Sequence, residues 1–378
     1  MRIGLLVMSV GSYGNKGFYN LQEVGLGKAL CEKGYTVDIY KCVHKKGPDK
    51  TESIAPNLTL HFINVNTINN NSIFRCEKLL DKELDVLVCF SDIQFWTTRV
   101  WKWAEKSNVI FIPYVGIIRS TSPSFIKRKT VNLLSAEVFN TYRKTGVFVK
   151  NRTVGKELRN KGIKDVCVVP VGLDFDIMHR DYNVPDQKLR QDLGLEPGLK
   201  YLLMVGRIEN DRDPLDVVPV LDELYRKDHD FRLIVIGNGS LRDALFSSLA
   251  KKGLSGIVRH IPRVSNSDMW MYYRASYALV SFSRTEIFGM SILEAMYYEL
   301  PVFVMHAPGP DDIITDRETG RLFYSLEDMS AALMNKISDQ MGKNAHRQIT
   351  EHFSWNSMVD AISEKIGKIR SDPSAGAN

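Results

Sequence analysis

Short apolar runs alternate with stretches of helical periodicity along almost the whole chain. The runs of the first half stand at 2–10, 35–40, 85–90, 109–113, 146–150 and 166–170. Those of the second half stand at 201–206, 231–237, 278–282 and 301–305. Apolar runs this short, separated by helices, are typical of βαβ units with buried parallel strands. The alternation therefore predicts an α/β protein built from parallel, doubly wound sheets.

A polar segment divides this pattern into two parts. The chain has 378 residues, which is enough for two domains of ordinary size. Residues 171–198 are rich in polar and turn-forming residues and separate the two groups of apolar runs. We therefore expect a first domain at 1–172 and a second at 173–354. A final amphipathic stretch at 354–369 predicts one last helix.

The composition is that of an ordinary globular protein. Hydrophobic residues make up 44% of the chain and charged residues 25%, which argues against disordered and fibrous classes. The first apolar run is too short to span a membrane, and a glycine-rich loop follows it, as after a first strand. Five cysteines form no C-x-x-C pair, and eight histidines show no metal-ligand spacing. We expect a reduced, cytoplasmic protein without a metal site or cofactor.

The segment 283–302, SRTEIFGMSILEAMYYELPV, carries the charged side chains that point most clearly to chemistry. Glu286 falls in the loop after an apolar run, and Glu294 follows eight residues later in the first turns of an expected helix. Carboxylates in such places accept hydrogen bonds from the hydroxyls of sugars and ribose. Two glutamates at this spacing are also common on ordinary surfaces. The order of strand, loop, turn and helix around them favours a ligand site.

The turn between the two glutamates suits a bound phosphate. Phe288 and Gly289 form the turn, and a helix is expected to begin near Met290. The backbone N–H groups at a helix start are unpaired and bind anions. A glycine there allows the backbone to approach a ligand closely.

These residues resemble the E-x7-E signature of the retaining glycosyltransferases of family 4. The segment GRIENDRDPLDVV is similar to the family's G-R-(x)4-K-G element, with Arg207 at its arginine and Arg212 in place of its lysine. That replacement exchanges a point charge for a planar fork. The loop HAPGPDDII resembles a further family element, and Gly309 matches a glycine in it. The resemblance extends along nearly the whole chain.

The first domain carries weaker matches to the same family. Gly17 resembles a glycine of the loop that faces the donor diphosphate, although Phe18 replaces the second glycine of the pair. Many relatives have a histidine after the strand that ends here before Tyr114 and Gly116. We take these two residues, with Gln22 near the start of the first helix, as candidates for the acceptor side.

The resemblance implies a fold and a set of roles. The fold is GT-B: two Rossmann-like domains facing a cleft, with the C-terminal stretch 355–378 returning to the first domain. The reaction is metal-independent, hexosyltransferase-type transfer from a nucleoside-diphosphate sugar with retention at the anomeric carbon. We take UDP as the default nucleotide. Glu286, Arg207 and Arg212 are the catalytic candidates. The donor would be bound by Gly17, Arg207, Arg212, Glu286, Phe288, Gly289, Met290, Glu294 and Gly309.

A basic stretch points to the acceptor. Residues 119–164 carry twelve lysines and arginines against two glutamates, with aromatic residues between them. Such a surface attracts anionic lipid headgroups, and a solvated basic surface is the simpler alternative. The expected acceptor is a glycan or lipid-linked glycan, used in polysaccharide biosynthesis at the inner face of the membrane. No nucleic-acid-binding motif accompanies the net charge of +6.

Two alternative functions remain open. Sugar-nucleotide 2-epimerases share this architecture, but they need acid–base histidines and carboxylates, and few histidines follow strands here. A non-catalytic partner subunit of the same fold is the third reading. The presence of both arginines and both glutamates argues against it.

Overall fold

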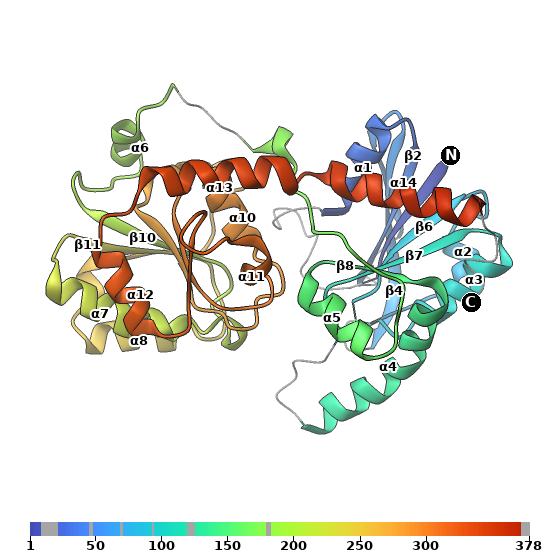
Figure 1. Ribbon diagram of the computed structural model, residues 1–378, viewed down its shortest axis with the longest axis horizontal. Helices are drawn as coiled ribbons and strands as arrows, with labels where there is room; N and C mark the ends of the chain where they lie inside the picture. The colour runs from blue at the N-terminus through green and yellow to red at the C-terminus, as the bar shows by residue number, and fades with distance from the viewer. Residues whose placement is uncertain are drawn as a thin grey trace. The chain divides into compact units, whose positions relative to one another are not determined.

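The computed structural model describes residues 1–8, 22–44, 48–68, 71–92, 94–118, 125–178 and 183–371, and between 125 and 134 it describes the backbone alone. The chain forms two compact units, each with its own sheet (Figure 1). The first unit consists of Met1–Gly172 and Trp355–Asn378, and the second of Leu173–Ser354. Each unit is an α/β domain, as the alternation of apolar runs predicts.

The sheet of the first unit is parallel at its centre. The strands follow the order β3-β4-β2-β1-β6-β7-β8-β9, and β5 pairs with β4. Only the pairs β3–β4 and β4–β5 are antiparallel among the described strands. Their bounds are β1 Arg2–Val7, β2 Thr36–His44, β3 Lys50–Ala55, β4 Leu58–Ile68, β5 Asn71–Ile73, β6 Val86–Phe90, β7 Ile110–Val115, β8 Val147–Val149 and β9 Val166–Val168.

The middle of this sheet is apolar on both faces. Leu5 of β1 lies opposite Ile39 of β2 and Val88 of β6, and all three side chains are fully buried. Burial on both faces explains why the central strands read as continuous apolar runs. The helices of the unit are α1 Gln22–Glu32, α2 Cys76–Leu79, α3 Thr97–Lys106, α4 Phe125–Thr145, α5 Arg152–Asn160 and α14 Trp355–Ser371.

The last helix belongs to the first unit although it ends the chain. Apolar residues of α14 at spacings of three and four are buried, Met358, Val359 and Ile362 among them, and the helix packs on α1 (Figure 1). The hydroxyls of Tyr35 and Ser363 lie 3.1 Å apart at this contact. The C-terminal helix therefore returns to the first unit, as the resemblance implies.

The sheet of the second unit is entirely parallel among its described strands. Its order is β12-β11-β10-β13-β14-β15. Leu203 of β10 lies between Ile234 of β11 and Leu279 of β13 at the buried centre. The strands are β10 Lys200–Val205, β11 Phe231–Ile236, β12 Val258–Ile261, β13 Ala278–Ser281, β14 Val302–Met305 and β15 Arg321–Phe323.

Helices cover this second sheet. Helix α7 packs with α12, and α10 packs with α13. The helices are α6 Asp186–Asp192, α7 Val217–Lys227, α8 Arg242–Lys251, α9 Met269–Ala275, α10 Met290–Tyr297, α11 Pro310–Ile313, α12 Leu326–Met334 and α13 Asp339–His352.

Several elements were not expected from the sequence. β3, β4 and β5 extend the first sheet, and β12 and β15 are the edge strands of the second. Residues 171–198, expected to be a linker, include α6 and a 3₁₀ turn at Phe175–Ile177. The additional strands lie at or near sheet edges, where partial exposure breaks up the apolar runs that mark central strands.

Candidate functional site

Most of the residues expected to hold the donor lie in three loops of the second unit. These loops follow β10, β13 and β14, which are neighbours in the sheet. The carboxyl ends of neighbouring parallel strands meet at one edge, and ligands of open α/β sheets bind outside that edge. Topology therefore brings together residues that are up to a hundred positions apart in sequence.

The loop after β10 carries the two arginines. Arg207 donates to Asp211 at 2.7 Å, and its side chain is 46% exposed. Arg212 ends a 3₁₀ turn at Asn210–Arg212, and its Nε lies 3.7 Å from the same aspartate. Asp211 therefore contacts both arginines, a role that the sequence alone did not reveal.

Glu286, in the loop after β13, forms an ion pair with Arg212. The guanidinium Nη1 contacts carboxylate Oε2. The other carboxylate oxygen accepts a hydrogen bond from the backbone N–H of Phe288 at 3.2 Å. The side chain of Glu286 is 15% exposed. The structure thus places a partly exposed guanidinium and a carboxylate side by side at the sheet edge.

Hydroxyl groups tie the β13 loop to the β10 loop. Ser283 and Thr285 both donate to the carbonyl oxygen of Asp211, at 2.7 and 2.9 Å. Arg284 donates to Asp216 at 2.7 Å. Because Arg212 and Glu286 are carried by loops joined in this way, their relative position is fixed by more than their own ion pair.

The loop after β14 supports Glu286 from the other side. The backbone N–H of Gly309 donates to the carbonyl of Glu286 at 2.8 Å. A Cβ at position 309 would lie 2.6 Å from backbone atoms of Phe288. Gly309 is therefore needed for a close approach of two backbone segments. Phe288 itself is buried, so it contributes its backbone and its packing against Phe353 rather than an exposed ring.

Helix α10 begins directly after this loop, as expected. Gly289 precedes it with φ of +88°, a left-handed conformation that favours glycine, and Met290 is the first helical residue. The helix therefore starts at the same sheet edge as the ion pair. The positive end of its helix dipole adds positive potential there.

Glu294 lies in the second turn of α10 and is 4% exposed. Its Oε2 accepts a hydrogen bond from the hydroxyl of Tyr273 at 2.8 Å. Burial raises the pKa of the Glu294 carboxyl well above its usual range, since the charged form loses hydration. No salt bridge to Glu294 occurs among the described residues.

The three acceptor candidates of the first unit differ in their surroundings. Gln22 is half-buried at the start of α1. Tyr114 lies within β7 rather than after it, is fully buried, and donates its hydroxyl to the carbonyl of Val169 at 3.1 Å. The expected acceptor contact of Tyr114 is therefore corrected: its side chain belongs to the core. Gly17 lies outside the described residues.

Gly116 belongs to a polar cluster at the carboxyl ends of β6, β7 and β8. The backbone N–H groups of Gly116 and Ile117 both donate to Asp92, and the Lys150 ammonium lies 3.1 Å from the same carboxylate. A Cβ at position 116 would lie 2.5 Å from the Lys150 side chain. Asp92 and Lys150 were not among the candidates taken from the sequence, although both follow strands as the other candidates do.

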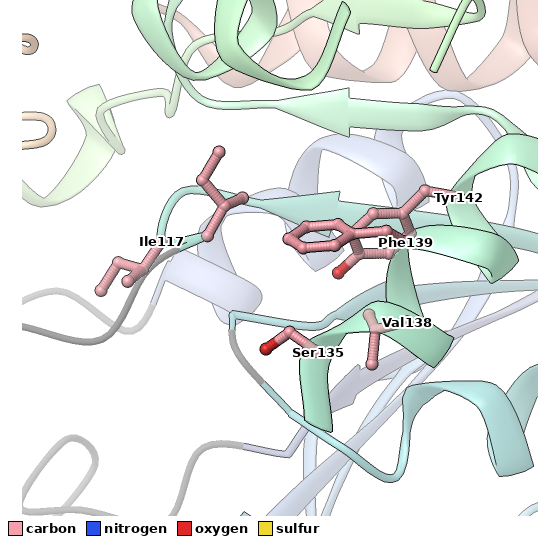
Figure 2. Close-up of a pocket in the computed structure, with 6 residues that line it drawn as sticks. Ile117, Ser135, Val138, Phe139 and Tyr142 are labelled. Atoms are coloured by element: carbon pink, nitrogen blue, oxygen red, sulfur yellow. The ribbon is translucent and has the colours of Figure 1, made fainter. Parts of the chain in front are cut away.

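An apolar hollow lies beside this cluster. Figure 2 shows the rings of Phe139 and Tyr142, both from α4, near Ile117 of the loop after β7. Ile118, Ser135 and Val138 complete its lining. The Tyr142 hydroxyl lies 2.9 Å from that of Ser91, next to Asp92.

The basic stretch is described in part, since residues 119–124 lie outside the described ranges. On α5, Arg152, Lys156 and Arg159 are exposed at spacings of four and three, which place them on one helix face. Val154 and Leu158 are buried on the opposite face. The buried side chain of Asn151 caps this helix by accepting from the Val154 N–H at 2.8 Å.

The described part of the chain contains neither a cluster suited to a metal ion nor a helix suited to spanning a membrane. No group of three or more His, Cys, Asp or Glu side chains is arranged to hold a metal ion within it. No described helix combines the length and apolar character needed to cross a bilayer.

Comparison with known families and proteins identifies relatives. Residues 185–353 match the family of glycosyl transferases group 1. Alpha-monoglucosyldiacylglycerol synthase of Streptococcus pneumoniae is 23% identical over 203 residues, which cover 53% of this chain and 45% of the relative. The enzyme of the same name from Acholeplasma laidlawii is 23% identical over 222 residues, covering 56% of each chain. The chain thus spans about half the length of the first curated relatives it matches.

Solved structures match nearly the full chain. Sucrose-phosphate synthase from Thermosynechococcus elongatus has a TM-score of 0.75 at 16% identity, covering 98% of this chain and 99% of that one. HepE of Anabaena, solved in complex with UDP and glucose, has a TM-score of 0.71 at 15% identity and covers 97% and 100%. At these identities the likeness shows the fold alone, which is GT-B.

Proposed function

We propose that the chain is a retaining glycosyltransferase, since residues 185–353 match the glycosyl transferases of group 1. It would transfer a sugar from a nucleoside-diphosphate sugar to a glycan or a lipid-linked glycan. The observation that carries this proposal is the pairing of Arg212 with Glu286, beside Arg207, at the carboxyl edge of the second sheet. A diphosphate needs cations and a sugar needs hydrogen-bond acceptors, and both are present at this edge.

The two arginines and the start of α10 would bind the diphosphate. Arg207 is half-exposed and Arg212 is partly exposed, so both guanidinium groups are accessible to a ligand. Guanidinium groups bind phosphate oxygens through two parallel hydrogen bonds. The charge that develops on the leaving diphosphate is compensated by these groups, so the reaction needs no metal ion. Activity in excess chelator tests that point.

Glu286 would exchange Arg212 for hydroxyl groups of the donor sugar. The phosphate oxygens then bind the guanidinium of Arg212, and the freed carboxylate of Glu286 accepts hydrogen bonds from the sugar hydroxyls. Glu294, one turn into α10, would accept from the ribose hydroxyls. We take UDP as the first nucleotide to test, and the likeness to HepE, solved with UDP, supports that choice.

The bond changes follow from the groups present. The bond between the anomeric carbon and the diphosphate oxygen breaks, and the acceptor oxygen bonds to the same face of that carbon. The acceptor hydroxyl passes its proton to the leaving diphosphate. This route needs no covalent nucleophile from the protein.

The acceptor is proposed to be lipid-linked. Two relatives carry the name alpha-monoglucosyldiacylglycerol synthase. The exposed basic face of α5 suits anionic lipid headgroups, and the hollow at Ile117 and Phe139 adds apolar surface in the same unit (Figure 2). We therefore place the protein in the cytoplasm, attached peripherally to the inner face of the membrane.

Liposome co-sedimentation tests the membrane contact. The protein should bind vesicles that contain anionic lipid and not neutral vesicles, and Arg152→Gln with Lys156→Gln should reduce binding. Lys188→Gln with Lys251→Gln, two exposed lysines of the second unit, is the matched control. Equal binding to both kinds of vesicle would remove membrane attachment from the proposal.

A transfer assay tests the reaction itself. The protein is incubated with a radiolabelled nucleoside-diphosphate sugar and a membrane-lipid extract, and the product is analysed by nuclear magnetic resonance. Transfer with retained anomeric configuration is expected. Conversion of the donor to its 2-epimer in the absence of any acceptor would instead establish the epimerase alternative.

A further inference from the structure

The hydroxyl of Tyr273 lies beside the carboxylate of Glu294. Tyr273 belongs to α9 and Glu294 to α10, and the hydroxyl donates to Oε2 at 2.8 Å. The two side chains are 1% and 4% exposed. A hydrogen bond between two buried groups stabilises one geometry strongly, because neither partner has water as an alternative.

The ring of Tyr273 is itself held in place. It stacks on Tyr298 with ring centroids 5.5 Å apart and an angle of 14° between the planes. Tyr298 caps the C-terminus of α10, the helix that carries Glu294. The side chain of Tyr273 is thus held against α10 at two positions one turn apart, by stacking on Tyr298 and by the hydrogen bond to Glu294.

The bond leaves the two carboxylate oxygens of Glu294 in different situations. Oε2 is satisfied by Tyr273, whereas Oε1 accepts no hydrogen bond from any described residue. Oε1 is not one of the described polar atoms that are fully enclosed without a partner, so a ligand can reach it with a hydrogen-bond donor. The two vicinal hydroxyls of a ribose are donors of the right kind, and they carry no charge that burial would penalise.

We propose that Tyr273 is a positioning residue for nucleotide binding: by holding Oε2, it presents Oε1 of Glu294 to the ribose hydroxyls of a nucleoside diphosphate. The inference rests on the proposed function, which assigns the ribose to Glu294. It adds Tyr273, a residue that the E-x7-E pattern does not include, as the group that orients Glu294 toward the ribose.

The test compares two ligands by isothermal titration of the full chain. UDP carries the ribose diol, and 2′,3′-dideoxyuridine diphosphate carries the same base and phosphates without it. Tyr273→Phe keeps the stacked ring and removes only the hydroxyl. It should weaken UDP binding up to about tenfold, as expected for the loss of one hydrogen bond, and leave binding of the dideoxy nucleotide unchanged.

Tyr272→Phe is the matched control. Tyr272 is the neighbouring buried tyrosine on α9, and its hydroxyl makes no hydrogen bond with Glu294 among the described residues. This variant should bind both nucleotides as the unaltered protein does. If Tyr273→Phe weakens binding of both ligands equally, or of neither, the positioning role is overturned while nucleotide binding stands. If the unaltered protein binds neither UDP nor GDP, the proposed function is overturned and this inference with it.

A second variant covers the case in which Tyr273→Phe does not fold. Tyr298→Leu keeps the Tyr273 hydroxyl but removes the ring that holds it. It should weaken UDP binding several-fold and spare the dideoxy nucleotide. Unchanged UDP binding in this variant would contradict the positioning role.

Discussion

Arg212 and Glu286 form an ion pair between the loops of two neighbouring strands. The guanidinium is 29% exposed and the carboxylate 15%. In the proposed reaction Arg212 exchanges the carboxylate for the diphosphate, which is also an anion, and Glu286 exchanges the guanidinium for neutral sugar hydroxyls. Partly exposed ion pairs contribute little to stability. Breaking this pair when the donor binds should therefore cost little free energy.

Replacing Arg212 should weaken nucleotide binding and leave the stability of the fold nearly unchanged. Arg212→Gln removes a charge-assisted contact to the diphosphate, and the affinity for nucleoside diphosphates should fall about tenfold to a hundredfold. The free energy of unfolding should change by less than about 1 kcal/mol. Calorimetric titration and urea unfolding measure the two quantities.

Arg226→Gln is the control for this prediction. Arg226 is an exposed arginine of α7, paired with Asp222 in the same unit. It should leave nucleotide affinity unchanged. If both variants lose affinity equally, the effect is one of net charge, and the assignment of Arg212 to the diphosphate fails.

Gly309→Ala should damage the site through the backbone. The added Cβ would lie 2.6 Å from backbone atoms of Phe288, so the loop that carries Glu286 must shift. We expect a loss of about 1–3 kcal/mol in unfolding free energy and a fall in turnover. Gly256→Ala is the control, because nothing lies within 4 Å of its Cβ position. Wild-type turnover in Gly309→Ala would show that the loop position is not critical.

A buried ion pair in the first unit should matter for stability. Lys41 of β2 and Glu23 of α1 contact one another with side chains 4% and 8% exposed. Lys41→Met leaves the Glu23 charge buried without a partner, and should cost about 3–5 kcal/mol of unfolding free energy. The double variant Glu23→Leu with Lys41→Met should recover most of that loss. Thermal unfolding of the three proteins distinguishes these outcomes, and a single variant as stable as the wild type would contradict the pairing.

The raised pKa of Glu294 predicts a pH-dependent stability. Because burial raises the pKa in the folded state, the folded protein binds a proton more tightly than the unfolded chain does. The stability that comes from this tighter proton binding is fully present below the ordinary glutamate pKa. It is lost as the pH rises through the raised pKa of the folded state. Between the two pKa values, the wild type should lose up to about 1.4 kcal/mol per pH unit relative to Glu294→Gln.

Urea unfolding across a pH series measures this difference. Glu105→Gln, at an exposed position of α3, is the control and should follow the wild type. Parallel curves for the wild type and Glu294→Gln would show that Glu294 does not titrate differently on folding.

The fold was predictable where burial is complete. The central strands β1, β6, β10 and β11 are largely apolar on both faces, and the sequence shows each as an apolar run in which any charged residue stands at the first or second position. β4, from Leu58 to Ile68, alternates buried and exposed positions instead, and that alternation is the signal that could have found it. Edge strands such as β3 and β12 are too exposed to show either pattern.

The grouping of the candidate residues was predictable where they follow strands along the chain. Arg207, Glu286 and Gly309 were chosen in this way, and their loops follow three neighbouring strands; their roles stay predictions. Tyr273 was not chosen, because its contact with Glu294 joins two helices 21 residues apart and leaves no spacing to recognise. Tyr114 was misplaced because β7 continues two residues beyond the expected end of the strand, which takes its ring into the core.

The central claim is that the second unit binds a nucleoside-diphosphate sugar through Glu286, Glu294 and the two arginines. The most direct measurement is the melting temperature of the purified protein with a panel of UDP-, GDP- and TDP-sugars, in the presence of chelator. A ligand that binds only the folded state raises the melting temperature by mass action. The account predicts that one donor raises it and that Glu294→Ala abolishes the rise. No rise with any sugar nucleotide, or an equal rise in Glu294→Ala, would contradict it.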